Sequence, residues 1–139
     1  MENERIEKAL EVHKRRYNCC QAVLCAFADK LDIAPEQLFK ISEAFGGGMG
    51  SSTEGACGAL VAATMILSLQ CSDGNLEQPA TKAQTYARER DLIAAFREKA
   101  GAILCKDIKG IETGIPLTGC DQCIMAGVEI ILDAFDEMK

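Results

Sequence analysis

The sequence predicts an all-α protein, a single-domain bundle of about five helices that spans residues 1–139. Three observations predict this fold class. Apolar residues recur at intervals of three and four through most of the chain, which is the spacing of a helix with one buried face. Residues 56–71 form an apolar run rich in Ala, and this length and composition favour a buried helix over a strand. No segment has the hairpin or βαβ pattern that would indicate a sheet.

The first predicted helix spans residues 4–31. Its single apolar stripe, spaced alternately by four and three, contains Ile6, Leu10, His13, Tyr17, Cys20, Leu24, Phe27 and Leu31. Since such a stripe packs against neighbouring helices, we expect its members to lie in the core. His13 is the only histidine of the chain, and we expect it to be a hydrogen-bonded core imidazole rather than a ligand or a base.

The second and third predicted helices flank a glycine-rich loop. Pro35 lies in the first turn of the second helix, where its missing N–H costs no hydrogen bond. Residues 46–55, GGGMGSSTEG, offer backbone freedom but little to pack, and they predict a loop. The third helix, residues 56–71, is apolar on all sides, as expected when neighbours surround it. We expect Ser51 or Thr53 to cap this helix.

Pro79 opens the fourth predicted helix, which runs to about Lys99 and is closed by Gly101. Its candidate core positions are Ala83, Tyr86, Ala87, Leu92, Ala95 and Phe96. Residues 104–109 are long enough for one helical turn. A loop containing Gly and Pro then leads to the last helix.

The last predicted helix starts near Thr118 and runs through Phe135. Thr118 and Asp121 have the spacing of a capping box, in which two side chains satisfy the free N–H groups of the first turn. Apolar residues at intervals of three and four again predict one buried face.

The charge balance excludes several classes of partner. The chain has 15 Lys and Arg against 21 Asp and Glu, a formal net charge of -6, whereas nucleic acids and anionic membrane surfaces are bound through clustered cations. No apolar run reaches the length of about 18 residues that spans a bilayer. The first residues are charged and periodic, unlike a signal peptide, so we expect a cytoplasmic protein that is not inserted into a membrane. Structural disulfides are rare in the cytoplasm, and the eight cysteines of this chain therefore require another explanation.

Cys57 and the pair Cys120 and Cys123 are the strongest chemical candidates. Cys57 falls at the start of the third helix, where the helix dipole would stabilise a thiolate, so we expect a lowered pKa; packing of a small core residue is the alternative. Cys120 and Cys123 form a C-x-x-C sequence that places both sulfurs on one helix face, able to form a disulfide or share a metal. A zinc ribbon needs a second such pair, which the sequence lacks.

The other five cysteines differ in what surrounds them. Cys20 lies on the apolar stripe and is expected in the core, whereas Cys19 points about 100° away from it, on a flank of small residues. Cys25 and Cys71 have only apolar surroundings. Cys105 stands before Lys106, a cation that would favour its thiolate. With one histidine, no phosphate-loop lysine and scattered acidic residues, the remaining candidate chemistry belongs to sulfur.

Five parts of the sequence form a pattern over almost the whole chain: Asn18-Cys19-Cys20-Gln21-Ala22-Val23, Phe45-Gly46-Gly47-Gly48-Met49-Gly50, Cys57-Gly58-Ala59, Cys105 and a cysteine at the start of the last helix. This pattern resembles that of the C_GCAxxG_C_C family of redox-active proteins. The resemblance implies a site built from Cys19, Cys57, Cys105 and either Cys120 or Cys123, of which Cys120 is preferred. Ala62 stands where the family's CGAxxG motif ends in Gly, which adds a methyl group but removes no thiol.

The resemblance implies redox activity of one of two kinds. Four convergent thiolates would suit an iron–sulfur cluster such as [2Fe–2S], or another thiolate-bound metal, for electron transfer; pairs of thiols would suit thiol–disulfide exchange without a cofactor. In the second case we expect Cys57 to attack and Cys105 or Cys120 to resolve. The alternative function is a non-catalytic metal-binding module or a partner of a membrane transporter. The redox partner is unidentified, and the small-residue flank of the first helix could support a homodimer.

Overall fold

The computed structural model describes residues 2–139, with side chains from residue 4 onward. The predicted all-α class is confirmed, with seven α-helices in this range instead of about five. Their bounds are α1 Glu2–Lys14, α2 Cys19–Cys25, α3 Pro35–Ser42, α4 Gly58–Cys71, α5 Lys82–Ala100, α6 Cys105–Lys109 and α7 Cys120–Ala134. Three single 3₁₀ turns accompany them, namely Ala28–Lys30, Glu43–Phe45 and Asp136–Met138. Among these residues the extended backbone amounts to one isolated antiparallel bridge, between Ala56 and Leu104.

The single helix predicted over residues 4–31 is wrong, because the chain breaks between α1 and α2. Arg16 adopts a left-handed conformation with φ of 76°. Asn18 then starts α2 with a capping box: its side-chain oxygen accepts a hydrogen bond from the Gln21 N–H at 2.9 Å, and the Gln21 side-chain oxygen accepts one from the Asn18 N–H at 3.0 Å. Such caps stabilise a new helix start. The apolar periodicity continues across the break because both helices pack on the same core.

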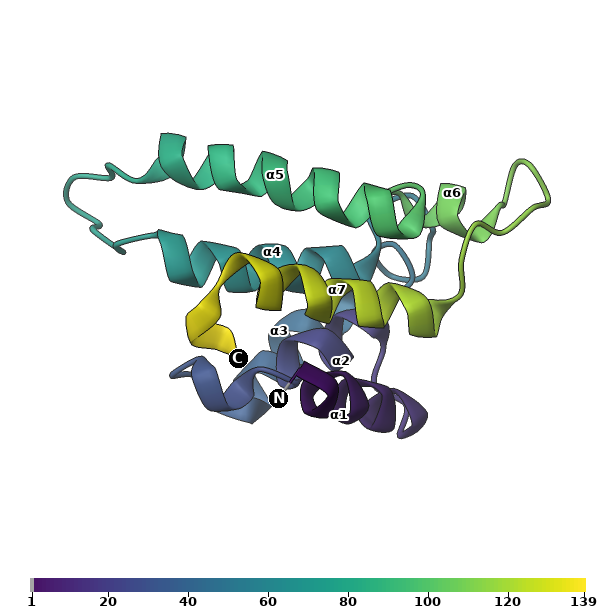
Figure 1. Cartoon of the computed structure of the whole chain (residues 1–139), viewed down its shortest axis with the longest axis horizontal. Coiled ribbons are helices and arrows are strands. Elements are labelled where there is room, and N and C mark those ends of the chain that lie inside the picture. The colour runs from purple at the N-terminus through teal and green to yellow at the C-terminus, as the bar shows by residue number, and fades with distance from the viewer. Residues whose placement is uncertain (1) are drawn as a thin grey trace.

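The central position predicted for residues 56–71 is confirmed. Helix α4 contacts α2, α5 and α7, and Figure 1 shows α4 and α7 running lengthwise beneath α5, with α1 to α3 on their other side. The helices α4 and α7 pack closely at Gly127, where an added Cβ atom would lie only 3.0 Å from the Ala59 carbonyl oxygen. Ala62 is fully buried, so the methyl group at this position is accommodated in the core.

The start of α4 differs from the expectation. Its N-cap is Cys57, and neither Ser51 nor Thr53 caps it. Both of these residues have positive φ angles within the glycine-rich loop. This loop folds back on itself through backbone hydrogen bonds, such as that from the Gly55 N–H to the Gly48 carbonyl oxygen at 2.9 Å. The loop therefore ends directly at Cys57.

Helix α5 begins at Lys82 after the cap residue Thr81, three residues later than predicted from Pro79. Gly101 ends it in a left-handed conformation with φ of 90°, as predicted. Leu92 and Phe96 are buried as expected, and Ala95 is partly buried against the core. The predicted core positions in the first half of α5 are instead exposed, namely Ala83, Tyr86 and Ala87. Figure 1 shows the reason: α5 is an outer layer of the bundle.

The predicted turn at residues 104–109 is confirmed as α6. Helix α7 starts at Cys120 with Gly119 as its N-cap, and the capping box predicted from Thr118 does not form. Asp121 instead contacts His13 of α1 at 3.1 Å. A long-range contact thus replaces the local one that the sequence suggested.

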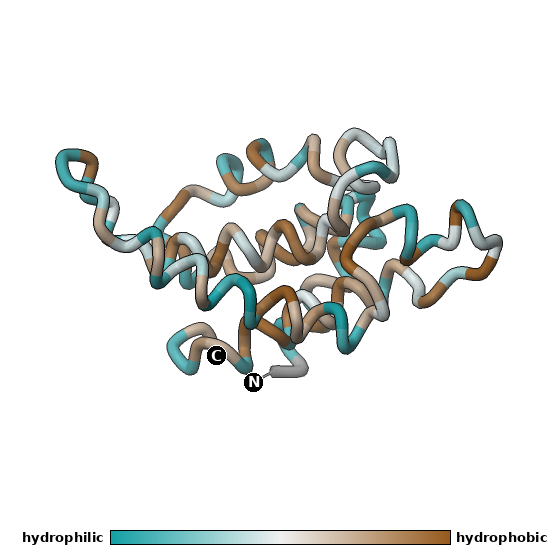
Figure 2. The backbone as a smooth tube through the Cα atoms, turned by 90° about the horizontal axis from the view of Figure 1, so that it is seen from above, coloured by the Kyte–Doolittle hydropathy of each residue, from teal (hydrophilic) through white to brown (hydrophobic). Residues whose placement is uncertain are grey.

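Two loops lie at opposite ends of the molecule. Figure 2 shows hydrophobic residues concentrated along the inner helices and hydrophilic ones at the surface. The loops that follow α4 and α6 project from opposite ends (Figure 1). No helix within residues 2–139 combines the length and the apolar character needed to cross a bilayer.

Candidate functional site

Five of the eight cysteines line one cavity of about 170 Å³. They are Cys19, Cys57, Cys105, Cys120 and Cys123. The structure thus brings together the four residues of the expected site and the alternative fourth cysteine, although they come from four separate segments of the chain. His13, Asn18 and Lys109 are among the other residues that line this cavity.

Four of these cysteines stand at the starts of helices. Cys19, Cys105 and Cys120 are the first residues of α2, α6 and α7, and Cys57 is the N-cap of α4. Cys123 lies one turn into α7. The starts of four helices therefore meet around the cavity, and the local signals that begin each helix also set the position of each sulfur.

A short backbone pairing joins two of these segments. The Cys57 N–H donates to the Ile103 carbonyl oxygen at 2.8 Å, and the Cys105 N–H donates to the Gly55 carbonyl oxygen at 3.0 Å. These hydrogen bonds flank the bridge between Ala56 and Leu104. They hold the start of α4 beside the start of α6, although the two lie almost 50 residues apart in sequence.

Glycines give the cysteines room. A Cβ atom at Gly58 would lie 2.5 Å from the Cys19 Sγ atom, and one at Gly48 would lie 2.6 Å from the Cys105 Cβ atom. Gly48 also has a φ of 72°, a conformation that side chains other than glycine rarely adopt. The glycine-rich loop and the first residue of α4 therefore form a wall that only glycine can make at these contacts.

Cys57 is the central thiol of a hydrogen-bonded series. It donates to Cys123 and accepts from Cys19. The hydrogen bond to Cys123, together with burial, raises the pKa of Cys57 to about 12. The lowered pKa expected from the helix start is therefore wrong, because the opposing effects of the Cys19 thiol and the Ala59 backbone N–H are outweighed.

Cys123 and Cys19 are the two ends of this series. The hydrogen bond received from Cys57 lowers the pKa of the buried Cys123 thiol. Cys19 is affected in the opposite direction: donation to Cys57, followed by burial, raises its pKa strongly, and the backbone N–H groups of Gly47 and Cys20 only partly oppose this. Cys123 is thus the member of the series that most readily becomes a thiolate, since the acceptor of a hydrogen bond is stabilised in its charged form.

The cation that acts on Cys105 is not Lys106, the one that the sequence suggested. Burial raises its pKa, and the cation that opposes this effect is Lys109, which lines the cavity. Lys106 pairs instead with Glu112 at 3.4 Å. The expectation for Lys106 is wrong because residue 109, four positions after Cys105, lies on the same face of α6, whereas residue 106 lies about 100° around the helix.

Cys120 is the exposed member of the five cavity cysteines. Cys57, Cys105 and Cys123 are buried, and Cys19 is intermediate. Cys120 interacts electrostatically with both Cys123 and Cys105. The C-x-x-C sequence thus places one thiol at the surface and the other inside, with both on the cavity.

His13 is the functional candidate that the sequence missed. It lines the cavity and its Nδ1 atom lies 3.1 Å from the Asp121 carboxylate, so it is not the core imidazole that was expected. The correction follows from the break after α1, which places His13 in the last turn of that helix. Asp121 lies 108 residues away in sequence, and no local pattern indicates this pairing.

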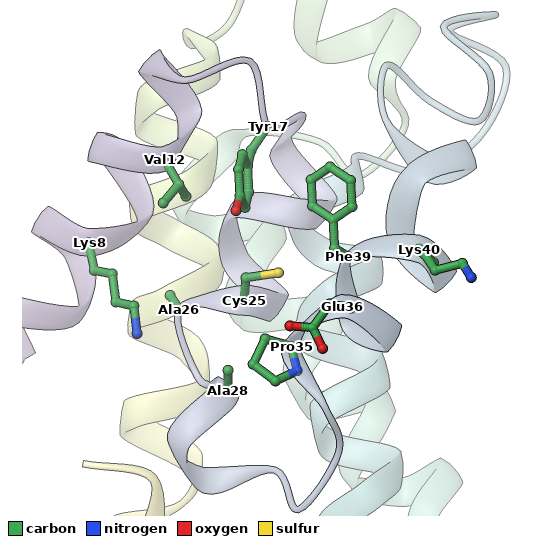
Figure 3. Close-up of a pocket in the computed structure, with 10 residues that line it drawn as sticks. All are labelled: Lys8, Val12, Tyr17, Cys25, Ala26, Ala28, Pro35, Glu36, Phe39 and Lys40. Carbon is green, nitrogen blue, oxygen red and sulfur yellow. The ribbon is translucent and has the colours of Figure 1, made fainter.

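The remaining three cysteines lie outside the cavity. Cys20 is fully buried in the core, as predicted, while Cys25 and Cys71 are half-buried. Cys25 lines a separate groove of about 470 Å³ and is the only cysteine there. Figure 3 shows Cys25 in this groove with Tyr17 and Phe39, whose rings stack edge to face at 4.9 Å. The groove is therefore a different feature from the cysteine cavity.

The donor set of the cavity can be compared with the needs of a metal. Thiolates are the ligands of iron–sulfur clusters, so the residue types fit. The arrangement does not: within the described residues, no three His, Cys, Asp or Glu side chains converge so as to hold a metal ion. Binding of a cluster or metal would require the thiols to move toward a common centre.

Comparison with known proteins identifies the family. No curated protein and no solved structure matches the chain. The sequence model of one family, described as "Putative redox-active protein (C_GCAxxG_C_C)", matches residues 17–134. This range contains all five cavity cysteines and most of the chain. The protein therefore belongs to the C_GCAxxG_C_C family.

Proposed function

We propose that the protein is a thiol–disulfide redox protein whose working pair is Cys57 and Cys123. The observation that carries this proposal is the hydrogen bond from the Cys57 thiol to Cys123 inside the cavity. In the oxidising direction the two thiols form one disulfide and give up two protons and two electrons. The electrons pass to the disulfide of a partner, which takes up two protons and becomes two thiols.

The acidity of the two thiols supports an assignment of roles. The thiolate is the nucleophile in disulfide exchange. Cys123 has the lowered pKa and Cys57 the raised one. We therefore assign Cys123 as the attacking thiolate of the pair, in place of Cys57, and Cys57 as the thiol that completes the disulfide, in place of Cys105 or Cys120.

The packing of α4 against α7 supports closure of this pair. A disulfide requires a sulfur–sulfur distance of about 2.05 Å and Cα atoms within about 7 Å. Cys57 is the N-cap of α4 and Cys123 lies one turn into α7, and the two helices touch nearby at Ala59 and Gly127. This close helix contact beside the two cysteines supports a separation short enough for a disulfide.

Cys19 adds a third thiol to this pair. It donates a hydrogen bond to Cys57, and its own raised pKa keeps it protonated. In this role Cys19 holds the Cys57 sulfur in place and stabilises the Cys57 thiolate when Cys57 leaves as a product of reduction.

Peptide mapping of the oxidised protein tests the proposal. The folded, reduced protein is treated with diamide, its remaining thiols are alkylated, and non-reduced peptides are identified by mass spectrometry. We expect a Cys57–Cys123 crosslink in the wild type and in a Cys25→Ser control, since Cys25 lies in the separate groove. We expect no such crosslink in Cys57→Ser. A folded wild-type protein in which Cys57 remains a free thiol after oxidation would overturn the proposal.

The second candidate is an iron–sulfur cluster or another thiolate-bound metal. The observation that favours it is the presence of five thiols on one cavity. Cys19, Cys57, Cys105 and Cys120 would hold such a group, with Cys123 as the substitute for Cys120, and it would supply one-electron transfer. Anaerobic reconstitution followed by iron and sulfide analysis tests this candidate. A colourless protein without bound iron contradicts this candidate. If Cys57→Ser binds as much iron as the wild type, the iron does not bind in this cavity.

A further inference from the structure

Four of the five cavity cysteines form a series that begins at the surface. Cys120 is exposed, Cys123 and Cys57 are buried, and Cys19, which is partly exposed, ends the series on α2. Neighbouring members interact in this order: Cys120 with Cys123 electrostatically, Cys123 with Cys57 and Cys57 with Cys19 by hydrogen bonds. A protein-sized partner can reach the first of these sulfurs but not the pair within.

We propose that Cys120 is the outer thiol through which the disulfide of a partner protein exchanges electrons with the Cys57 and Cys123 pair. This inference rests on the proposed function and adds a residue, an order of steps and a class of partner to it. Cys105 also borders Cys120, but it is buried, so it offers no alternative point of contact.

The exchange proceeds in three balanced steps. The Cys120 thiolate attacks the partner disulfide, which forms a mixed disulfide and releases one partner thiolate. The Cys123 thiolate then attacks the Cys120 sulfur, which forms a Cys120–Cys123 disulfide and releases the second partner thiolate. Finally Cys57 attacks the Cys123 sulfur and passes its proton to the departing Cys120 sulfur, which forms Cys57–Cys123 and returns Cys120 to the thiol. Each step forms one S–S bond and breaks one, so no other oxidant is needed.

Helix geometry supports the second step. Cys120 and Cys123 are three residues apart in the first turns of α7, and residues at this spacing lie on the same face. Both line the cavity. The released Cys120 would again stand at the surface, ready for another partner molecule.

The loop that precedes Cys120 in sequence supports a protein as the partner. The loop between α6 and α7 leads directly to Cys120 and projects from one end of the molecule (Figure 1). Three apolar side chains of this loop are exposed, namely Ile111, Ile115 and Leu117, by 59%, 69% and 52%. Exposed apolar residues beside a reactive group are typical of a site that docks another protein. A small oxidant needs no such surface.

The experiment uses a protein-sized probe, ubiquitin with one introduced cysteine activated as a mixed disulfide with thionitrobenzoate. All variants carry Cys25→Ser and Cys71→Ser, because these two half-buried thiols lie outside the cavity. Release of thionitrobenzoate reports attack by a thiol of the protein. We expect Cys120→Ser to slow this release at least tenfold relative to the parent, and Cys123→Ser to accumulate a stable ubiquitin adduct on Cys120, because the second step is missing.

Diamide provides the control, since a small oxidant reaches the inner pair without Cys120. We expect Cys120→Ser to form the Cys57–Cys123 crosslink with diamide at a rate within about twofold of the parent. Release by Cys120→Ser at the parent rate, or an adduct mapped to another cysteine in Cys123→Ser, overturns the role of Cys120. Loss of the diamide crosslink in the parent itself overturns the proposed function instead, so the two failures are distinguishable.

Discussion

Cys57 and Cys123 share one hydrogen bond but differ in acidity because they occupy opposite ends of it. As donor, Cys57 loses the bond when it ionises, and its pKa rises to about 12. As acceptor, Cys123 keeps the bond as a thiolate, and its pKa falls. Burial raises the pKa of both thiols, so the hydrogen bond decides which thiol is the more acidic. At the residue scale, the direction of one hydrogen bond thus sets the order of acidity within the proposed pair.

This difference predicts the order of alkylation. With iodoacetamide over a series of pH values, we expect Cys123 to be half-ionised at a lower pH than Cys57, as measured by peptide mapping. Cys57→Ala removes the donor, and we expect it to shift the Cys123 midpoint to higher pH, while Cys25→Ala leaves it unchanged. A Cys123 midpoint equal to or above that of Cys57 would show that the acidity of the pair is reversed.

At the scale of elements, the site depends on helix starts and on the glycines between them. Four helices begin at the cavity, and the glycine-rich loop closes one side of it. Gly58 is one of the restricted positions, since a Cβ atom there would lie 2.5 Å from the Cys19 Sγ atom. An alanine is usually more stable than glycine in a helix by up to about 1 kcal/mol. Here the contact with Cys19 reverses that preference.

We therefore expect Gly58→Ala to lower the free energy of unfolding of the reduced protein by about 1–3 kcal/mol, the usual cost of overpacking. Urea denaturation measures it. Ser68→Ala is the matched control in the same helix, where the side chain is exposed, and it should stay within about 0.5 kcal/mol of the wild type. Equal stability of Gly58→Ala and the wild type would mean that Cys19 is free to move away.

The sequence predicted those elements that local signals determine. Pro35 and Gly101 were placed correctly because each acts through its own backbone, and α4 was predicted because its composition alone requires burial. The capping pair of Asn18 and Gln21 is also present in the sequence, but the apolar stripe runs through it and predicts one continuous helix. A periodic stripe indicates burial, not continuity of the helix.

The site was predicted less completely than the fold, for a physical reason. The family resemblance pointed to four of the cavity cysteines, whereas the hydrogen bond between Cys57 and Cys123 depends on how α4 packs against α7. His13 and Asp121 meet only because α1 lies against α7. Contacts between distant segments are set by packing of the whole chain, and no spacing within one segment reports them.

At the scale of the whole molecule, oxidation would link two segments far apart in sequence. A Cys57–Cys123 disulfide closes a loop of about 65 residues, and in the chain-entropy account such a loop stabilises the fold by up to about 4 kcal/mol. We expect the melting temperature of the oxidised protein to exceed that of the reduced protein by several degrees in calorimetry. Cys123→Ser should show no such difference between oxidising and reducing conditions. A lower melting temperature on oxidation would indicate that the disulfide strains the fold.

The buried thiols also predict how stability depends on pH in the reduced protein. Cys57 and Cys20 have pKa values raised from 9.0 to about 12, Cys57 chiefly by its hydrogen bond to Cys123 and Cys20 by burial. Above pH 9 the unfolded chain loses these protons and the folded chain keeps them, so stability falls as pH rises from about 9 toward 12. The slope cannot exceed about 1.4 kcal/mol per pH unit for each thiol. Urea midpoints measured at pH 7, 9 and 10.5 check this, and a constant midpoint above pH 9 would contradict it.

The most direct test of the central claim is a redox titration of the wild-type protein. The protein is equilibrated in mixtures of oxidised and reduced dithiothreitol, and free thiols are counted by mass spectrometry after alkylation. We predict one transition in which two thiols disappear together, with the slope of a two-electron couple, about 30 mV per tenfold change. It should persist in Cys25→Ser and be absent in Cys123→Ser. A transition unchanged in Cys123→Ser, or a wild type that keeps all eight thiols throughout the titration, would contradict the claim.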